Sequence, residues 1–116
     1  MKHFVITLAL KASREEIGPR QLMLHDNHFR AGYDLGLVLL YGPLNPSNGY
    51  LAIARSESAR TLANFLAEDP LVVDHLASVE IREYQPIGFS ESLRGWVHPS
   101  DPGVWPSNGD CPAAYI

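Results

Sequence analysis

His25 is the residue of this sequence whose type and position best suit proton transfer. It falls within residues 20–35, which have helical spacing, and it shares the apolar arc of that segment with Leu22, His28 and Phe29. An imidazole can give or take a proton near neutral pH, so a position of this kind is typical of a general acid or base. The ordinary alternative is a histidine at the edge of the core whose ring bonds to a backbone carbonyl.

His25 and His28 together raise the question of a metal site, because two histidines at this spacing can share one face of a helix. Such a site needs a third ligand and usually a fourth group. The sequence offers no clear third ligand, so we predict neither a bound metal nor a cofactor.

Asp69 is the second candidate for acid–base chemistry. It lies at the C-terminal end of a second predicted helix, on the same arc as Leu62, Phe65 and Leu66. A carboxylate at that end faces the negative pole of the helix dipole, which favours its protonated form. An aspartate followed by Pro70 is also a good cap and first turn for the short segment after it. Both interpretations can hold together.

Several other side chains could contact a substrate but have ordinary alternatives. Single arginines at the margins of helices and strands can bind anions but are usually solvated, and strand tyrosines can line a cavity or simply pack. These residues are Arg20, Arg55, Arg82, Tyr41 and Tyr84. The sequence has no Gly-rich phosphate loop, nucleophile elbow or metalloprotease helix. It therefore favours proton transfer over the chemistries of those motifs.

The elements that must position these groups follow from hydrophobic periodicity and turn residues. The predicted segments, in order, are a strand at 2–10, a loop with a helical turn at 11–19, a helix at 20–35 stopped by Gly36, a strand at 37–41, a turn through 42–49, a strand at 50–55, a helix capped by Ser56 and ended by Pro70, a short turn at 71–75 and a strand at 78–84.

The order β-α-β-β-α-β is the ferredoxin-like plan of an α+β protein. Two amphipathic helices can cover only one face of its four-stranded sheet. We expect the other face to carry Val5, Ala9, Ala52, Ala54 and Tyr84, which is too apolar to remain in water. A homodimer in which two sheets pack face to face would cover it, and we predict that homodimer.

Residues 85–116 differ in composition from the rest of the chain. Prolines and glycines alternate there, and no helical or strand period persists. Trp96, Trp105 and Tyr115 are nevertheless large side chains whose burial would be favourable. We therefore divide the chain into a domain at 1–89 and an irregular extension at 90–116, which packs on the domain or on its dimer partner.

The overall composition limits the partners. The chain has 116 residues, of which 46% are hydrophobic and 19% charged, as is typical of one globular domain. Its net charge of −4 and the lack of a basic block argue against nucleic acid, and no apolar run is long enough to span a membrane. The charged residues after the first strand argue against a signal peptide. With Cys111 as the single cysteine, we expect a cytoplasmic protein.

A series of short motifs runs through residues 1–89. They are His25, Gly36 with the run 37–41, Gly42-Pro43, Gly49, Ser58-Ala59, Phe65, Asp69-Pro70 and Val79-Glu80-Ile81. In this order and spacing they resemble the YCII-related domain family. The resemblance implies a ferredoxin-like protomer and a dimeric α+β barrel, an architecture shared with muconolactone isomerases. It also implies a histidine–aspartate active site, which carries over to His25 and Asp69. Leu22 and Leu71 stand where the family often has an arginine and an aromatic residue.

The resemblance also implies a class of chemistry, since one branch of the family eliminates chloride from a chlorinated hydroxyhydroquinone. We predict a small cofactor-independent lyase or isomerase acting on an oxygenated ring compound, with or without a halogen. His25 would be the general base, and Asp69 would orient it or return a proton. The residues in contact with the substrate would be His28, Tyr41, Gly42 and Pro43. The alternatives are a non-catalytic module that binds a small molecule or a partner, and a heme- or quinone-handling monooxygenase of the same architecture.

Overall fold

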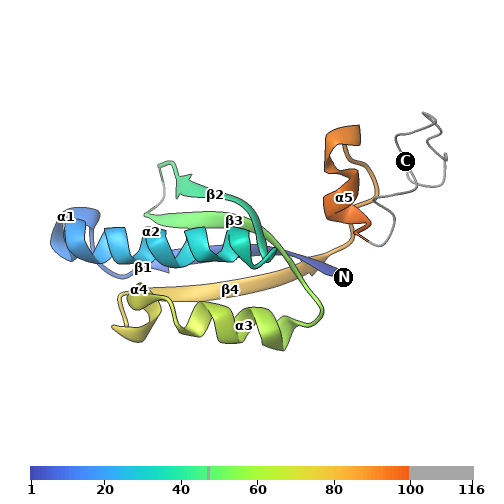
Figure 1. The fold of residues 1–116 in the computed structure, drawn as a ribbon. Coiled ribbons are helices and arrows are strands. Elements are labelled where there is room, and N and C mark those ends of the chain that lie inside the picture. Colours follow the sequence, from blue (N-terminus) through green and yellow to red (C-terminus); the bar gives the residue numbers. More distant parts are fainter. Residues whose placement is uncertain (47, 100–116) are drawn as a thin grey trace.

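The computed structural model describes residues 1–46 and 48–99 and has an α+β architecture (Figure 1). The elements are β1 (Lys2–Leu10), α1 (Arg14–Ile17), α2 (Pro19–Asp34), β2 (Val38–Leu44), β3 (Gly49–Ser56), α3 (Ala59–Ala67), α4 (Pro70–Val73), β4 (Ala77–Tyr84), the 3₁₀ turn η1 (Glu91–Leu93) and α5 (Arg94–Val97). The strands form one antiparallel sheet in the order β2-β3-β1-β4. This is the ferredoxin-like arrangement, so the predicted fold class is confirmed.

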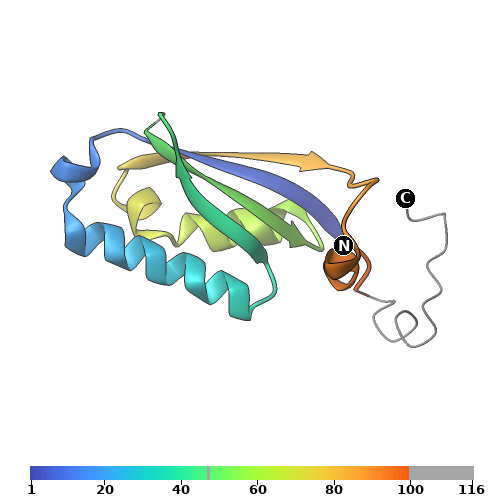
Figure 2. The ribbon, with the colours of Figure 1, turned by 90° about the horizontal axis from the view of Figure 1, so that it is seen from above.

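Helices α2 and α3 lie on one face of the sheet and leave the other face open (Figure 2). Alternate residues of β1, Phe4, Ile6 and Leu8, are buried on the covered face. They form one core cluster with Phe29 of α2 and Leu62 of α3. The layer between sheet and helices is therefore dry, and polar groups that enter it must find partners there.

The faces of β3 differ from the prediction. Ala52 and Ala54 pair with core residues of β1, point toward the helices and are fully buried, so placing them on the open face was wrong. Val5, Ala9 and Tyr84 do lie on the open face, as their register requires. The error has a physical cause. The residues of β3 are apolar at consecutive positions, and alternation fixes a buried face only where the other face is polar.

Helix α3 begins two residues later than predicted. Ser58, not Ser56, is its N-cap, and the Ser58 hydroxyl accepts a hydrogen bond from the backbone N–H of Thr61 at 3.1 Å. Ser56 instead ends β3, where it pairs with Lys2 and is buried. The strand continues farther than its apolar run, because pairing with β1 extends through the polar residues at its end.

Gly49 fixes how closely the β2–β3 hairpin approaches β1. A Cβ atom at this position would lie 2.2 Å from the carbonyl oxygen of Leu8, so a side chain would force the two strands apart. The pairing that follows sets the register of Tyr50 opposite Leu8. Tyr50 is thereby directed into the layer that holds His25.

Part of the extension is regular and contacts the domain. Arg55 of β3 donates hydrogen bonds to the carbonyls of Gly95 (3.2 Å) and Trp96 (2.7 Å), and its guanidinium carbon lies 4.1 Å from the centroid of a ring of Trp96. Residues 91–97 form η1 and α5, although the sequence predicted no regular structure there. Trp105, Cys111 and Tyr115 lie outside the described residues.

Candidate active site

His25 lies on the side of α2 that faces the sheet. Its side chain is 0% exposed, and three aromatic rings surround it. The centroid of the His25 ring lies 5.0 Å from that of Phe29, 5.8 Å from that of Tyr41 and 4.7 Å from that of Tyr50. Phe29 comes from the next turn of α2, and the tyrosines come from β2 and β3. Helical spacing and strand register therefore enclose the imidazole together.

Asp69 approaches the same imidazole from the junction of α3 and α4, and it too is 0% exposed. Its Oδ2 lies 2.6 Å from His25 Nδ1. Its Oδ1 accepts a hydrogen bond of 2.8 Å from the backbone N–H of Leu71, which makes Asp69 the N-cap of α4 with Pro70 as the first helical residue. One carboxylate oxygen thus caps a helix, as one interpretation of Asp69 expected, while the other contacts the histidine.

The contact with Asp69 determines what the other nitrogen of His25 can do. A carboxylate accepts, so Nδ1 carries the hydrogen and the neutral ring presents a lone pair at Nε2. Among the described residues, Nε2 is buried and has no hydrogen-bond partner. A buried polar atom without a partner costs about 1–3 kcal/mol, and such atoms are commonly explained by a catalytic role or a bound molecule. The arrangement can accept a proton at Nε2 and stabilise the resulting imidazolium through Asp69.

Tyr41 and Asp26 close the layer beside His25 and are half-buried. The Tyr41 hydroxyl donates a hydrogen bond to Oδ1 of Asp26, and the Tyr41 ring stacks on Phe29 at 4.7 Å between centroids. Burial, with the Asp26 carboxylate as the next cause, raises the pKa of Tyr41 well above its ordinary value. Tyr41 therefore stays a neutral hydrogen-bond donor at neutral pH.

Tyr50 and Arg14 also belong to this cluster, and the sequence did not single them out. The Arg14 guanidinium carbon lies 5.0 Å from the centroid of the Tyr50 ring, and Nη2 donates a 2.9 Å hydrogen bond to the Gly49 carbonyl. The pattern Ser13-x-x-Glu16 is a capping box that places Arg14 at the start of α1. Tertiary packing decides which strand Arg14 contacts. No local pattern in the sequence therefore predicts its contact with Tyr50.

His28 does not join the pair. Its Nε2 lies 2.7 Å from the carbonyl oxygen of Phe65, and its ring stacks on the Phe65 ring with 4.3 Å between centroids and 19° between planes. These contacts connect α2 to α3. His28 thus binds the neighbouring helix, although the same helical arc led us to expect it at the substrate.

Gly42 and Pro43 lie on opposite faces of β2. Gly42 pairs with Leu51 and therefore lies on the open face, away from His25. Pro43 pairs with Tyr50 and lies on the covered face, at an exposed position of the strand. Of the four residues expected at the substrate, Tyr41 is the one whose ring is near the His25 ring.

The remaining polar candidates lie elsewhere. Arg82 forms an exposed ion pair with Glu80 at 3.0 Å, and Arg55 binds the extension. Tyr84 is on the open face, where its ring is near that of His3.

Within residues 1–46 and 48–99, no group of three His, Cys, Asp or Glu side chains is arranged to hold a metal ion. Within the same residues, no helix is both long and apolar enough to cross a membrane.

The His25–Asp69 pair is enclosed. Cavities of about 270, 280 and 590 Å³ occur in other parts of the described structure, and their linings include neither residue. The smallest, between α3, α4 and β4, is lined by apolar side chains including Leu66 and Val79. A ligand could therefore reach Nε2 of His25 only if neighbouring side chains moved.

Comparisons with known proteins support the fold. No protein-family model and no curated protein sequence matches the chain. Its structure is similar to 5-chloro-2-hydroxyhydroquinone dehydrochlorinase from Burkholderia phenoliruptrix AC1100, solved in complex with 2,5-dihydroxybenzoquinone. That similarity has a TM-score of 0.55 at 15% identity and covers 71% of this chain and 92% of that one. It is also similar to protein Atu4242 from Agrobacterium tumefaciens, with a TM-score of 0.51 at 20% identity, over 78% of this chain and 98% of that one.

Proposed function

We propose that the chain is a small lyase or isomerase of the YCII-related domain family, with His25 as general base and Asp69 as the residue that positions it. One observation carries the proposal. The buried Nδ1–Oδ2 contact of 2.6 Å leaves Nε2 with a lone pair and, among the described residues, no partner. A purely structural histidine would normally have both nitrogens satisfied. An imidazole oriented by a carboxylate is instead suited to taking a proton from a bound molecule.

The proposed substrate is an oxygenated ring compound, with or without a chlorine substituent. This class comes from the dehydrochlorinase with the same fold, whose name and bound 2,5-dihydroxybenzoquinone describe that protein. In this chain, the rings of Phe29, Tyr41 and Tyr50 around His25 supply flat apolar walls for such a ring. The compound would enter beside Tyr41 and Asp26, the half-buried pair next to His25.

The chemistry needs only a proton acceptor and an electron-withdrawing carbonyl in the substrate. In an elimination, Nε2 takes a proton from a ring carbon, the C–H electron pair forms a new double bond, and chloride leaves with the C–Cl electron pair. In an isomerisation, the imidazolium returns the proton to a different carbon. Asp69 stabilises the imidazolium in both cases, and a general base of this kind contributes about 10²–10⁴-fold to the rate.

A direct test measures chloride release and absorbance changes with a panel of chlorinated and unchlorinated hydroxyhydroquinones, catechols and muconolactones. We expect His25→Gln to lower kcat/KM at least 100-fold while the fold persists. His75→Asn is the matched control, because His75 is exposed and has a positive φ of 59°, which asparagine tolerates. Full turnover by His25→Gln would exclude the proposed base.

The enclosure of the pair favours one alternative, a non-catalytic module that binds a small ring compound. In that case Asp69 and His25 would act as a buried polar contact between α2 and the α3–α4 junction. The same panel separates the two functions. A compound that binds in a thermal-shift assay and is recovered unchanged, with any product below detection, would support the binding module.

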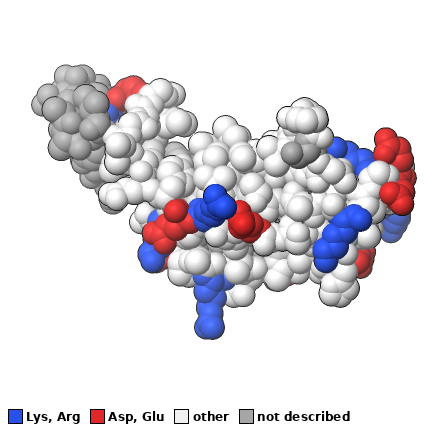
Figure 3. Space-filling model, turned by 180° about the vertical axis from the view of Figure 1, so that it is seen from behind, with Lys and Arg blue, Asp and Glu red and all other residues white. Residues whose placement is uncertain are grey.

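We also propose that two copies pack through their open sheet faces. Figure 3 shows this face from behind, with a group of acidic and basic side chains across its middle and uncharged side chains around them. The register of β4 against β1 places Glu80 and Arg82 on this face, opposite Thr7 and Val5, and its remaining part, over β1, β3 and β2, is mostly apolar. The face carries the half-buried Val5 and Ile53, and Leu40 is 53% exposed. An apolar face of this kind is unfavourable in water. We expect sedimentation at micromolar concentration to give a dimer and Ile53→Lys to give a monomer, whereas Val73→Lys, an exposed position on α4, should remain dimeric. A monomeric wild-type chain would contradict this.

A further inference from the structure

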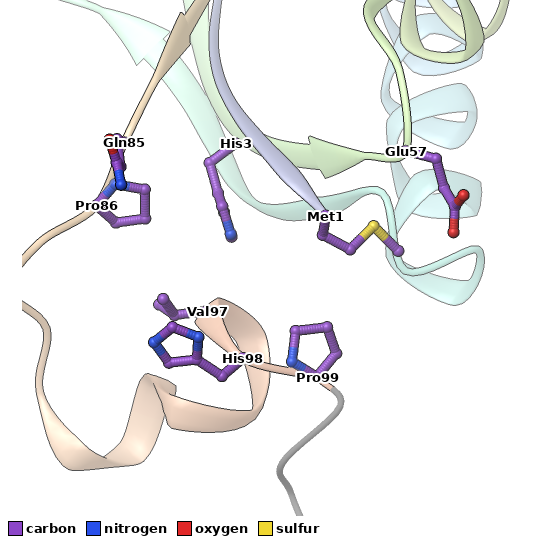
Figure 4. A pocket seen from close by; sticks show the side chains of 8 residues that line it. All are labelled: Met1, His3, Glu57, Gln85, Pro86, Val97, His98 and Pro99. Atoms are coloured by element: carbon purple, nitrogen blue, oxygen red, sulfur yellow. The ribbon is translucent and has the colours of Figure 1, made fainter. Parts of the chain in front are cut away.

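One of the three cavities described above lies at the end of the sheet where the extension meets the domain. Its volume is about 590 Å³, within the range that small-molecule sites occupy. Figure 4 shows the His3 side chain pointing from β1 toward Val97 and His98, with Gln85 on one side and Glu57 on the other. The geometry of this cavity suggests a binding function that does not involve the His25–Asp69 pair.

The cavity is separate from the candidate active site. Tyr50, whose ring contacts His25, pairs with Leu8 of β1, whereas the cavity begins at His3. Five residues of extended strand separate the two positions, or roughly 17 Å at 3.3–3.4 Å per residue. A molecule in one site therefore does not occupy the other.

The walls of the cavity are held in place. Arg55 binds the carbonyls of Gly95 and Trp96, and also donates a 3.0 Å hydrogen bond from Nε to the carbonyl of Gly36. The next residue, Val97, is buried and lines the cavity. These contacts preorganise the extension side of the site, which lowers the entropy cost of binding a ligand there.

His3 gives the cavity its chemistry. The side chain is 5% exposed, and its Nδ1 is buried and has no hydrogen-bond partner among the described residues, so a donor from a ligand reaches this atom only if neighbouring side chains move. Burial lowers the pKa of His3 below its ordinary value, and a hydrogen bond to the backbone of Val97 acts in the opposite direction. At neutral pH the ring is therefore neutral. With one nitrogen engaged by Val97, the lone pair at Nδ1 needs a donor.

The charges around His3 define which ligand can supply that donor. The positive charges of the amino terminus and of Arg55 act on His3 and disfavour another cation beside it, while the Glu57 carboxylate disfavours an anion. Pro86 and Val97 add apolar surface. We propose that this cavity binds a small uncharged ring compound that carries hydroxyl groups, which donate to His3 and Glu57 while the ring packs on the apolar walls.

The test is a titration of the full-length ¹⁵N-labelled chain with resorcinol, followed by NMR. We expect saturable shifts at the amides of Glu57, Gln85, Val97 and His98, with a dissociation constant on the order of millimolar for a ligand of this size. The compound 1,3-dimethoxybenzene has the same ring and no hydroxyl donors, so it should bind at least about tenfold more weakly.

Variants show whether His3 is responsible. We expect His3→Phe to weaken resorcinol binding about tenfold or more, and His75→Asn to leave it unchanged. Glu57→Ala should weaken resorcinol binding about threefold. Because Glu57 is exposed, this variant should fold, and it keeps the test decisive if His3→Phe does not fold. The proposal is overturned if no shifts saturate around the cavity, if they occur only near His25 and Tyr50, if the dimethoxy compound binds equally well, or if none of the lining variants weakens binding.

Discussion

At the scale of single residues, the two oxygens of Asp69 connect stability to chemistry. Oδ1 receives the Leu71 N–H that begins α4, and Oδ2 receives the Nδ1–H of His25. Since Pro70 has no N–H and fixes the first helical φ, the cap geometry holds the carboxylate in one orientation. The backbone geometry at the start of α4 therefore positions the Asp69 carboxylate, and the carboxylate positions the His25 imidazole.

Two substitutions of Asp69 separate its roles. Asparagine can still cap α4 but loses the charged contact with His25, so we expect Asp69→Asn to lower the free energy of unfolding by about 1.5–3 kcal/mol. Asp69→Ala also loses the cap and should be less stable by about a further 1 kcal/mol. Urea denaturation of both variants measures the difference. Equal stability of the two variants would show that the cap contributes nothing.

The buried His3 makes stability depend on pH. Because the pKa of His3 is lowered in the folded chain from its ordinary 6.5, the unfolded chain binds more protons below that pH. The contribution of neutral His3 to the free energy of unfolding is complete above pH 6.5. It is lost as the pH falls toward the lowered pKa of His3 in the folded chain. His98, Arg55 and the amino terminus act on His3 in the same direction. Urea denaturation from pH 7.5 to 5 should show a smaller decrease in stability for His3→Phe than for the unaltered chain. Identical pH profiles would contradict this.

At the scale of the elements, sequence periodicity predicted the long segments, whereas the short helices were expected only as turns or were missed. β1, α2, α3 and β4 each span several turns or alternations, so their apolar faces are visible in the sequence. α1 and α5 have four residues each, too few to show a period; α1 was expected as a helical turn within residues 11–19, and α5 was not predicted. The error at Ala52 and Ala54 arose in β3, where both faces of the strand are apolar, so the alternation of residues does not show which face is buried.

The candidate site could be predicted in part for the same reason. His25 lies on the apolar arc of α2, and Asp69 lies at the junction where α3 ends and α4 begins, on the same face of the sheet, so their meeting follows from amphipathicity and topology. Arg14 and Tyr50 are 36 residues apart, and their contact depends on how α1 packs beside β3. His28 shares the arc of His25 but binds Phe65, because an arc broad enough for both also faces α3.

The start of α3 provides a test at this scale. Ser58 accepts the Thr61 N–H, so Ser58→Ala should lower the free energy of unfolding by about 1 kcal/mol. Ser56 is buried at the end of β3, and within the described residues its hydroxyl has no partner. Ser56→Ala removes that unsatisfied group and should be neutral or stabilising. A larger loss for Ser56→Ala than for Ser58→Ala in urea denaturation would restore Ser56 as the cap.

At the scale of the whole molecule, the extension and the open face are coupled. Leu40 and Ile53 of the open face line a cavity of about 280 Å³ together with Phe89, at the end of the domain, and with Leu93 and Trp96 of the extension. The extension thus shelters one end of the face that two copies would share. Both the proposed dimer and the His3 cavity therefore depend on how residues 85–99 are held.

Shortening the chain tests how strongly the extension is held. Deleting residues 92–116 removes Trp96 and leaves the Arg55 guanidinium without the Gly95 and Trp96 carbonyls, which we expect to lower the free energy of unfolding by about 1–3 kcal/mol and the melting temperature with it. A chain ending at residue 99 keeps all of these contacts and is the matched control. Calorimetry of both shortened chains isolates the contribution of residues 92–99. Equal melting temperatures would mean that α5 only rests on the domain, and the walls of the His3 cavity would then lack the rigidity inferred for them.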